Sequence, residues 1–278
     1  MSPAEIQAME TVRAGDRDRY IAALYAPEDK RPAFFALYAF NVEIASVRDR
    51  IREPLPGEIR LQWWRDAIAG DEPQGNPLAE ALLGAIRRYN LPKKPFDDYL
   101  EARIFDLYDD PMPDRAALEG YCGETASALI QLAALVLDPE AASAVAEAAG
   151  HGGCAQAIAG LLRLLPQHRA RGQCFVPRDI LAAAGTTPDV FLVGTDPASA
   201  ARAVDAMTAL AGEHLAKFTS HAAAIAPALR PAFLPLAPTG AYLKKITGLG
   251  ARAVREPADI STLKRHWLVY RTASRGWA

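Results

Sequence analysis

Residues 32–52, PAFFALYAFNVEIASVRDRIR, carry the clearest periodic pattern in the chain. Apolar side chains recur there at steps of four and three residues, at Ala33, Leu37, Phe40, Ile44, Val47 and Ile51. Because an α-helix turns once every 3.6 residues, these positions form one apolar stripe. The stretch therefore predicts a helix that buries one face against neighbouring helices.

The composition extends this prediction to the whole chain of 278 residues. Alanine and leucine dominate the apolar half, and both lose little rotamer freedom in a helix. A capping residue precedes proline at Asn76-Pro77, Asp138-Pro139, Thr187-Pro188 and Asp196-Pro197, a pattern typical of helix starts. With no linker or repeat, we expect one all-α domain over residues 1–278. Further helices are expected near 16–26, 57–70, 77–89, 95–108, 114–137, 139–165, 177–184, 197–225, 227–247 and 257–272.

Charge and cysteine content exclude several classes of protein. The 31 basic and 33 acidic side chains give a net charge of −2, which argues against a nucleic-acid partner. Three cysteines, Cys122, Cys154 and Cys174, are too few for a disulfide framework and indicate a reducing compartment. No signal-like segment and no apolar run of about 18 residues is present. We expect a cytoplasmic protein, and leave open a peripheral contact with the inner membrane.

Searches for common catalytic and metal-binding motifs give nothing. The chain lacks phosphate-binding glycine loops, a nucleophile elbow and an H-E-x-x-H motif, and its five histidines lack metal-ligand spacing. The acidic stretch 105–114, FDLYDDPMPD, lies where a predicted helix ends and runs into a loop with two prolines, which favours solvated acids over a metal site. The Asp106 carboxylate is expected to have a structural role.

Five segments together resemble the squalene/phytoene synthase family. They are LYAFNVEIASVRD (37–49), RLQWWRDAI (60–68), YCGETASAL (121–129), AQAIAGLLRLLPQHRARGQCFVP (155–177) and YLKKI (242–246). The resemblance implies the isoprenoid-synthase fold, a helical bundle around a central apolar cavity. It also implies that Phe40, Tyr121 and Leu164 line that cavity.

In that family two aspartate-rich motifs hold Mg²⁺ ions, which in turn bind a prenyl diphosphate. The resemblance places residues 45–49, ASVRD, on the first motif, where only Asp49 keeps a carboxylate. On the second motif Arg163 is kept, and the metal-binding positions carry Gly160, Leu164, Gln167 and His168. We therefore expect a synthase fold with no catalytic residues, no metal ligands and no cofactor. Pro166 should also break the helix that carries the second motif.

The resemblance places four side chains at the mouth of the cavity: Arg48, Asp49, Arg163 and His168. One interpretation is that they are solvated residues at helix ends. The other is that Arg48, Arg163 and His168 bind an anionic headgroup or a partner's carboxylate without metal, because the guanidinium fork suits such groups. The second interpretation predicts that binding weakens as the pH rises through the titration of His168.

The departures from the synthase motifs resemble a non-catalytic branch of the family that includes an assembly factor of the respiratory NADH dehydrogenase. We therefore expect an assembly or scaffold factor for a membrane respiratory complex, with a subunit of that complex as partner and a lipid or isoprenoid chain as ligand. The first alternative is an active Mg²⁺-dependent prenyltransferase that uses farnesyl or geranylgeranyl diphosphate. Asp49 and Arg163 would then be its surviving active-site residues. The second alternative is a prenyl-lipid carrier.

The C-terminal segment 263–271, LKRHWLVYR, is both basic and aromatic. Such a helix can lie on a membrane surface. Its narrow apolar stripe, Leu263, Trp267 and Tyr270, instead favours a helix that docks on the bundle through these three side chains.

Overall fold

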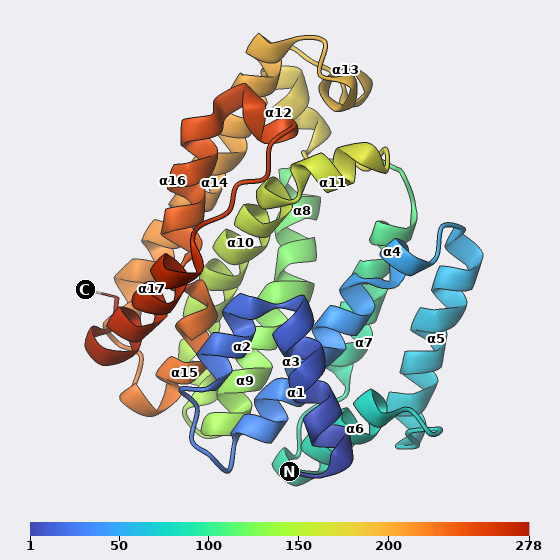
Figure 1. Ribbon diagram of the computed structural model, residues 1–278, viewed down its shortest axis with the longest axis vertical. Coiled ribbons are helices and arrows are strands. Elements are labelled where there is room, and N and C mark those ends of the chain that lie inside the picture. Colours follow the sequence, from blue (N-terminus) through green and yellow to red (C-terminus); the bar gives the residue numbers. More distant parts are fainter. Residues whose placement is uncertain (278) are drawn as a thin grey trace.

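The computed structural model describes residues 1–277, which form helices and no strands (Figure 1). In chain order the α-helices are α1 (Pro3–Gly15), α2 (Arg17–Ala23), α3 (Arg31–Ala45), α4 (Val47–Arg50), α5 (Pro54–Gly70), α6 (Pro77–Tyr89), α7 (Lys94–Ile104), α8 (Arg115–Cys122), α9 (Ala128–Leu137), α10 (Ala146–Arg163), α11 (Leu165–Ala170), α12 (Arg178–Ala183), α13 (Pro188–Val193), α14 (Pro197–Ala222), α15 (Arg230–Phe233), α16 (Thr239–Leu249) and α17 (Thr262–Arg275). Short 3₁₀ turns and one π-helical segment, η2 (Gly123–Ser127), connect several of them. The predicted all-α fold class is confirmed.

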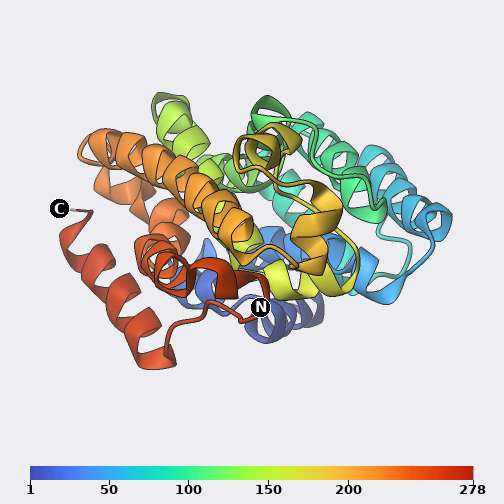
Figure 2. The same cartoon turned by 90° about the horizontal axis from the view of Figure 1, so that it is seen from above.

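Helix α10 lies in the middle of the bundle and packs against α14, α16 and η2 (Figure 1). On the other side of the molecule, α3 packs against α1, α6 and α9. Seen from above, the helices surround the centre in two groups, with α14 and α16 on one side and α5 to α7 on the other (Figure 2). Two large hydrophobic clusters fill these two parts of the bundle.

The periodic stretch 32–52 forms helix α3, which is shorter than predicted. The stripe from Ala33 to Val47 is buried, and Ile51 is half-buried. Helix α3 ends at Ala45 because the hydroxyl of Ser46 bonds to the carbonyl of Glu43, 3.0 Å away, and competes with the helical backbone pattern. The chain then resumes as the single turn α4.

Other boundaries differ from the prediction for local reasons. Helix α1 was not predicted, although Ser2 and Glu5 form a capping box that begins it. Helix α10 begins at Ala146 rather than near 139, because the Asp138 carboxylate accepts bonds from two following amides and closes a turn. The predicted helix 227–247 is broken into short turns before α16, because four prolines between 227 and 238 supply no backbone donor.

Two predictions of helix ends are confirmed. Helix α10 stops at Arg163, and Pro166 lies in the first turn of α11. Asn76, Thr187 and Asp196 each accept a bond from an amide in the first turn of α6, α13 and α14. These caps fix where the chain turns back into the bundle.

One continuous helical stretch, Arg115–Leu137, is long and apolar enough to cross a membrane by length and composition. It contains α8, η2 and α9, and 61% of its most apolar window is buried inside the bundle. It packs on α10 and α3. This stretch is therefore a core helix of the bundle.

Candidate functional site

A cavity of about 660 Å³ lies within the bundle. Its walls come from the start of α2, from α3, η2 and α10, and from α16 and α17. The volume is in the range of small-molecule sites. Apolar side chains and arginine–aspartate pairs share the lining, so the cavity differs from the apolar one that was expected.

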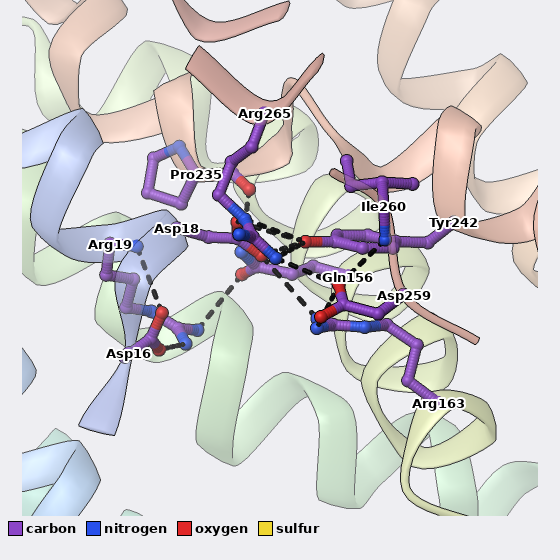
Figure 3. Close-up of polar contacts among 10 residues, drawn as sticks. All are labelled: Asp16, Asp18, Arg19, Gln156, Arg163, Pro235, Tyr242, Asp259, Ile260 and Arg265. Atoms are coloured by element: carbon purple, nitrogen blue, oxygen red, sulfur yellow. Dashed lines mark hydrogen bonds and ion pairs between the residues drawn. The ribbon is translucent and has the colours of Figure 1, made fainter. Parts of the chain in front are cut away.

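A group of five polar side chains, called here the inner cluster, forms one wall of this cavity (Figure 3). Its members are Asp18, Arg163, Tyr242, Asp259 and Arg265. Arg265 Nε donates to Asp18 Oδ1 at 2.5 Å, and Nη2 donates to Asp259 Oδ1 at 2.9 Å. The Tyr242 hydroxyl donates to Asp18 at 2.8 Å and accepts from Arg265 Nη2 at 3.1 Å. The inner cluster therefore joins α2 to α16 and α17.

The Arg265 side chain is only 5% exposed and that of Asp18 14% exposed. Burial raises the pKa of the Asp18 carboxyl above its usual value, aided by the nearby Asp16 and opposed by Arg163, Tyr242 and Arg265. Burying the Asp18 and Arg265 charges costs free energy, which their ion pairs and hydrogen bonds must offset.

Arg163 is held more loosely than Arg265. Its guanidinium stacks on the Tyr242 ring, 3.7 Å from the centroid, and lies 3.5 Å from Asp18 and 3.4 Å from Asp259. Its buried Nε has no hydrogen-bond partner among residues 1–277. Its guanidinium therefore keeps spare hydrogen-bonding capacity. Arg163 was predicted at the mouth; it lines the cavity as a member of the inner cluster.

A second arginine–aspartate pair lies beside the inner cluster. Asp16 caps α2 and binds Arg19 at 2.6 Å, and Arg19 donates to Gln156 on α10 at 3.1 Å (Figure 3). Gln156 in turn donates to the carbonyl of Pro235 at 3.0 Å. These contacts fix the entry of α2 against α10.

At the mouth, Asp49 is bound by Arg171 at 2.5 Å, and both side chains are partly exposed. Asp49 lines the cavity. Arg48 does not: its Nη2 binds Asp109 on a neighbouring loop at 2.9 Å. The structure thus brings Asp49 and Arg163 to the cavity and directs Arg48 to a contact with the protein.

The prediction that His168 titrates as part of an anion site at the mouth is wrong. His168 is buried, packs on Phe175 with ring centroids 4.6 Å apart, and is absent from the cavity lining. Burial, with a smaller effect from Arg171, lowers the pKa of His168 to about 4. The imidazole is therefore neutral at physiological pH, and raising the pH from neutrality removes no charge from the mouth.

The three predicted lining residues lie in different surroundings. Tyr121 and Leu164 line the cavity. Phe40 does not: it is buried among aromatic rings in the core, because the inward stripe of α3 packs there on α5 and α7. The Tyr121 hydroxyl donates to Asp106 at 2.8 Å and accepts from Arg103 at 2.8 Å. Asp106 does not itself line the cavity, but it is held by two residues that do, Arg103 and Tyr121.

The carboxylates at this cavity do not fit a Mg²⁺ cluster. The four that line it within the described chain are each bound to an arginine: Asp16, Asp18, Asp49 and Asp259. No group of three histidine, cysteine or acidic side chains in residues 1–277 is arranged to hold a metal ion. Mg²⁺ requires free oxygen ligands in octahedral geometry, and a guanidinium occupies these oxygens instead.

Sequence reasoning missed most of the inner cluster. One signal was available: Arg265 falls at i, with Val269 at i+4 and Thr272 at i+7, and all three are buried. A charged side chain on the buried face of a helix requires a buried partner of opposite charge. The partner, Asp18, lies about 250 positions earlier in the sequence, which local pattern does not reveal.

Comparisons with known proteins agree with this architecture. The family model described as squalene/phytoene synthase matches residues 12–269. The chain is 34% identical to NADH dehydrogenase (ubiquinone) complex I, assembly factor 6, of Bos taurus, over 86% of this chain and 72% of the relative. It is 28% identical to presqualene diphosphate synthase of Zymomonas mobilis, over 64% of this chain and 62% of the relative.

Among solved structures, the squalene synthase HpnC of Alicyclobacillus acidocaldarius superposes with a TM-score of 0.73. The match covers 89% of this chain and 94% of that one, at 22% identity, and it shows the shared fold. The model match and the identity to the bovine relative span most of the sequence. The chain belongs to the squalene/phytoene synthase family.

Proposed function

We propose that this chain is a non-catalytic member of the family and serves as an assembly factor for a respiratory NADH dehydrogenase. The observation that carries the proposal is the pairing of every described cavity carboxylate with an arginine. A diphosphate leaving group needs metal-borne positive charge, and that metal needs free carboxylates. The guanidinium groups that hold these carboxylates therefore weigh against a Mg²⁺-dependent step.

The similarity to assembly factor 6 supplies the role. That relative is named for the assembly of complex I, and the similarity extends over most of both chains. The match to presqualene diphosphate synthase covers less of the chain at lower identity. We infer that the partner is a subunit of the enzyme complex or an intermediate in its assembly.

One experiment tests the catalytic half of the proposal. Purified protein is incubated with farnesyl or geranylgeranyl diphosphate and Mg²⁺, and released diphosphate is measured beside an authentic squalene synthase. We expect less than one turnover per chain. Multiple turnovers that are lost on chelation of Mg²⁺ would establish the prenyltransferase alternative.

A second experiment tests the assembly role. The gene is deleted in the source organism, and assembled NADH dehydrogenase is measured by native electrophoresis with activity staining. We expect the assembled complex to fall and to return when the wild-type chain or Asp49→Ala is supplied, because Asp49 has no catalytic task in this proposal. Normal assembly in the deletion strain would contradict it.

We further propose that the cavity binds a lipid or isoprenoid chain whose anionic group contacts Arg163. Arg163 lines the cavity and lies 3.5 Å from Asp18 and 3.4 Å from Asp259, so these long contacts leave it able to bind a further anion. The cavity volume suits a small-molecule ligand. Native mass spectrometry should detect a copurifying lipid, and Arg163→Ala should lower its occupancy at least tenfold. Equal lipid occupancy in the variant and the wild type would show that Arg163 does not bind the ligand.

A further inference from the structure

Helix α17 has two faces of opposite character. Its inner face carries the buried residues Arg265, Val269 and Thr272 and closes the wall of the cavity. Its outer face carries Leu263, Trp267 and Tyr270, which are 81%, 58% and 55% exposed. The helix therefore docks on the bundle, but through the face opposite to the predicted stripe. That correction leaves an apolar stripe at i, i+4 and i+7 facing outward.

The charged side chains of α17 itself have one sign. Residues 262–275 contain no acidic side chain, and Lys264, His266, Arg271 and Arg275 are all exposed. A shallow groove of about 340 Å³ separates α17 from α16 and is lined by the exposed lysines Lys244, Lys245 and Lys264. Asp259 also reaches this groove, but its carboxylate is bound by Arg265 at 2.9 Å.

We propose that the outer face of α17, with the three-lysine groove, docks on the surface of an anionic lipid bilayer. Tryptophan and tyrosine combine an apolar ring with a polar tip and collect at membrane interfaces. Lysines beside such a stripe attract anionic headgroups, whereas lysine is depleted at protein–protein interfaces. The chemistry of this face therefore favours a lipid surface over an acidic protein.

The geometry also defines how the helix lies. A helix of 14 residues is about 21 Å long, which is too short to span a bilayer but suits one that lies along its surface. The groove and the cavity share Asp259, so the docked lipid surface lies next to the wall formed by the inner cluster. This inference is independent of the proposed assembly role, because vesicle binding requires neither a partner complex nor catalysis.

The test is flotation of the full chain with phosphatidylcholine vesicles, with and without phosphatidylglycerol, which supplies the anionic headgroups. We expect binding to the anionic vesicles, at least tenfold weaker binding to neutral ones, and release at high salt. The tryptophan fluorescence of the chain, which has four tryptophans, should shift to shorter wavelength on binding, and the Trp267→Ser variant should lose that shift.

Two sets of variants assign the surface. Lys244→Glu, Lys245→Glu and Lys264→Glu together, or Leu263→Ser with Trp267→Ser, should each weaken binding to anionic vesicles at least tenfold. The matched controls lie on other helices. Arg13→Glu, Arg87→Glu and Arg88→Glu together make the same change in net charge, and Leu55→Ser with Ile59→Ser alters α5, at the opposite edge of the molecule (Figure 1).

All these side chains are exposed, so circular dichroism should show unchanged folding. Wild-type protein that fails to float with anionic vesicles would overturn the proposal, and so would control variants that lose binding as strongly as the α17 variants. Recovery with cell membranes but not with protein-free anionic vesicles would indicate a protein partner and would also overturn it.

Discussion

The inner cluster and the mouth of the cavity both pair an aspartate with an arginine, yet the two pairs lie in different surroundings. Asp18 and Arg265 are 14% and 5% exposed, whereas Asp49 and Arg171 are 46% and 36% exposed. Water screens the second pair and barely reaches the first. The same chemistry therefore joins three helices at the inner wall and contributes little to stability at the mouth.

Breaking the inner cluster should have the largest effect on stability. Arg265→Met removes the guanidinium that binds Asp18 and Asp259 and leaves the Asp18 carboxylate buried with weaker partners. We expect the free energy of unfolding to fall by about 3 kcal/mol, measured by urea titration.

The same helix provides the control for that change. Arg271 is exposed on α17, and Arg271→Met should alter stability by less than about 0.5 kcal/mol. If the two arginines act differently because of Asp18, then Asp18→Asn combined with Arg265→Met should cost less than the sum of the single changes. Equal losses from Arg265→Met and Arg271→Met would show that the inner cluster does not hold α17.

A medium effect is expected from pH, through His168. The pKa of His168 is about 4 in the folded chain against 6.5 in the free side chain. As the pH falls, the unfolded chain takes up this proton first, so the stability present above pH 6.5 is lost progressively toward pH 4. Between pH 7 and pH 5 the free energy of unfolding should fall by about 2 kcal/mol from this group.

His168→Leu isolates that contribution, because leucine keeps an apolar side chain beside Phe175 and cannot take up a proton. The variant should lose about 2 kcal/mol less than the wild type over the same pH interval, by urea titration at each pH. Other buried groups affect both proteins alike and cancel. Parallel pH dependence in the two proteins would mean that His168 is solvated.

Helical periodicity together with the alanine- and leucine-rich composition was enough to predict an all-α fold, and local chemistry was enough for several helix ends. The stripe of α3 and the break before Pro166 follow from rules that act within a few residues. The boundaries that were wrong depend on equally local signals that compete with periodicity. Two examples are the turn before α10 and the end of α3. The Asp138 carboxylate accepts from the amide of Ala141, and the Ser46 hydroxyl donates to the carbonyl of Glu43, so in each case a side-chain oxygen takes the place of a backbone group.

The site was predictable only in part, because its contacts are distant in sequence. Arg163 and Asp49 were placed at the cavity by their resemblance to family motifs. The burial of His168 depends on its packing against Phe175. The outward direction of Trp267 depends on the buried ion pair between Arg265 and Asp18, which turns the opposite face of α17 inward. Which face of α17 turns inward was thus decided by a buried ion pair rather than by the apolar stripe.

The smallest effect is expected at the mouth. Arg171→Ala frees the Asp49 carboxylate, but an exposed ion pair contributes only about 0.5 kcal/mol, so urea titration should show little change. The more informative measurement is Mg²⁺ binding by calorimetry. One freed carboxylate supplies too few oxygen ligands, because the remaining cavity carboxylates stay bound to arginine, so no binding in the micromolar range is expected. Tight Mg²⁺ binding by Arg171→Ala, but not by the control Arg271→Ala, would show that a single ion pair separates this cavity from a metal site.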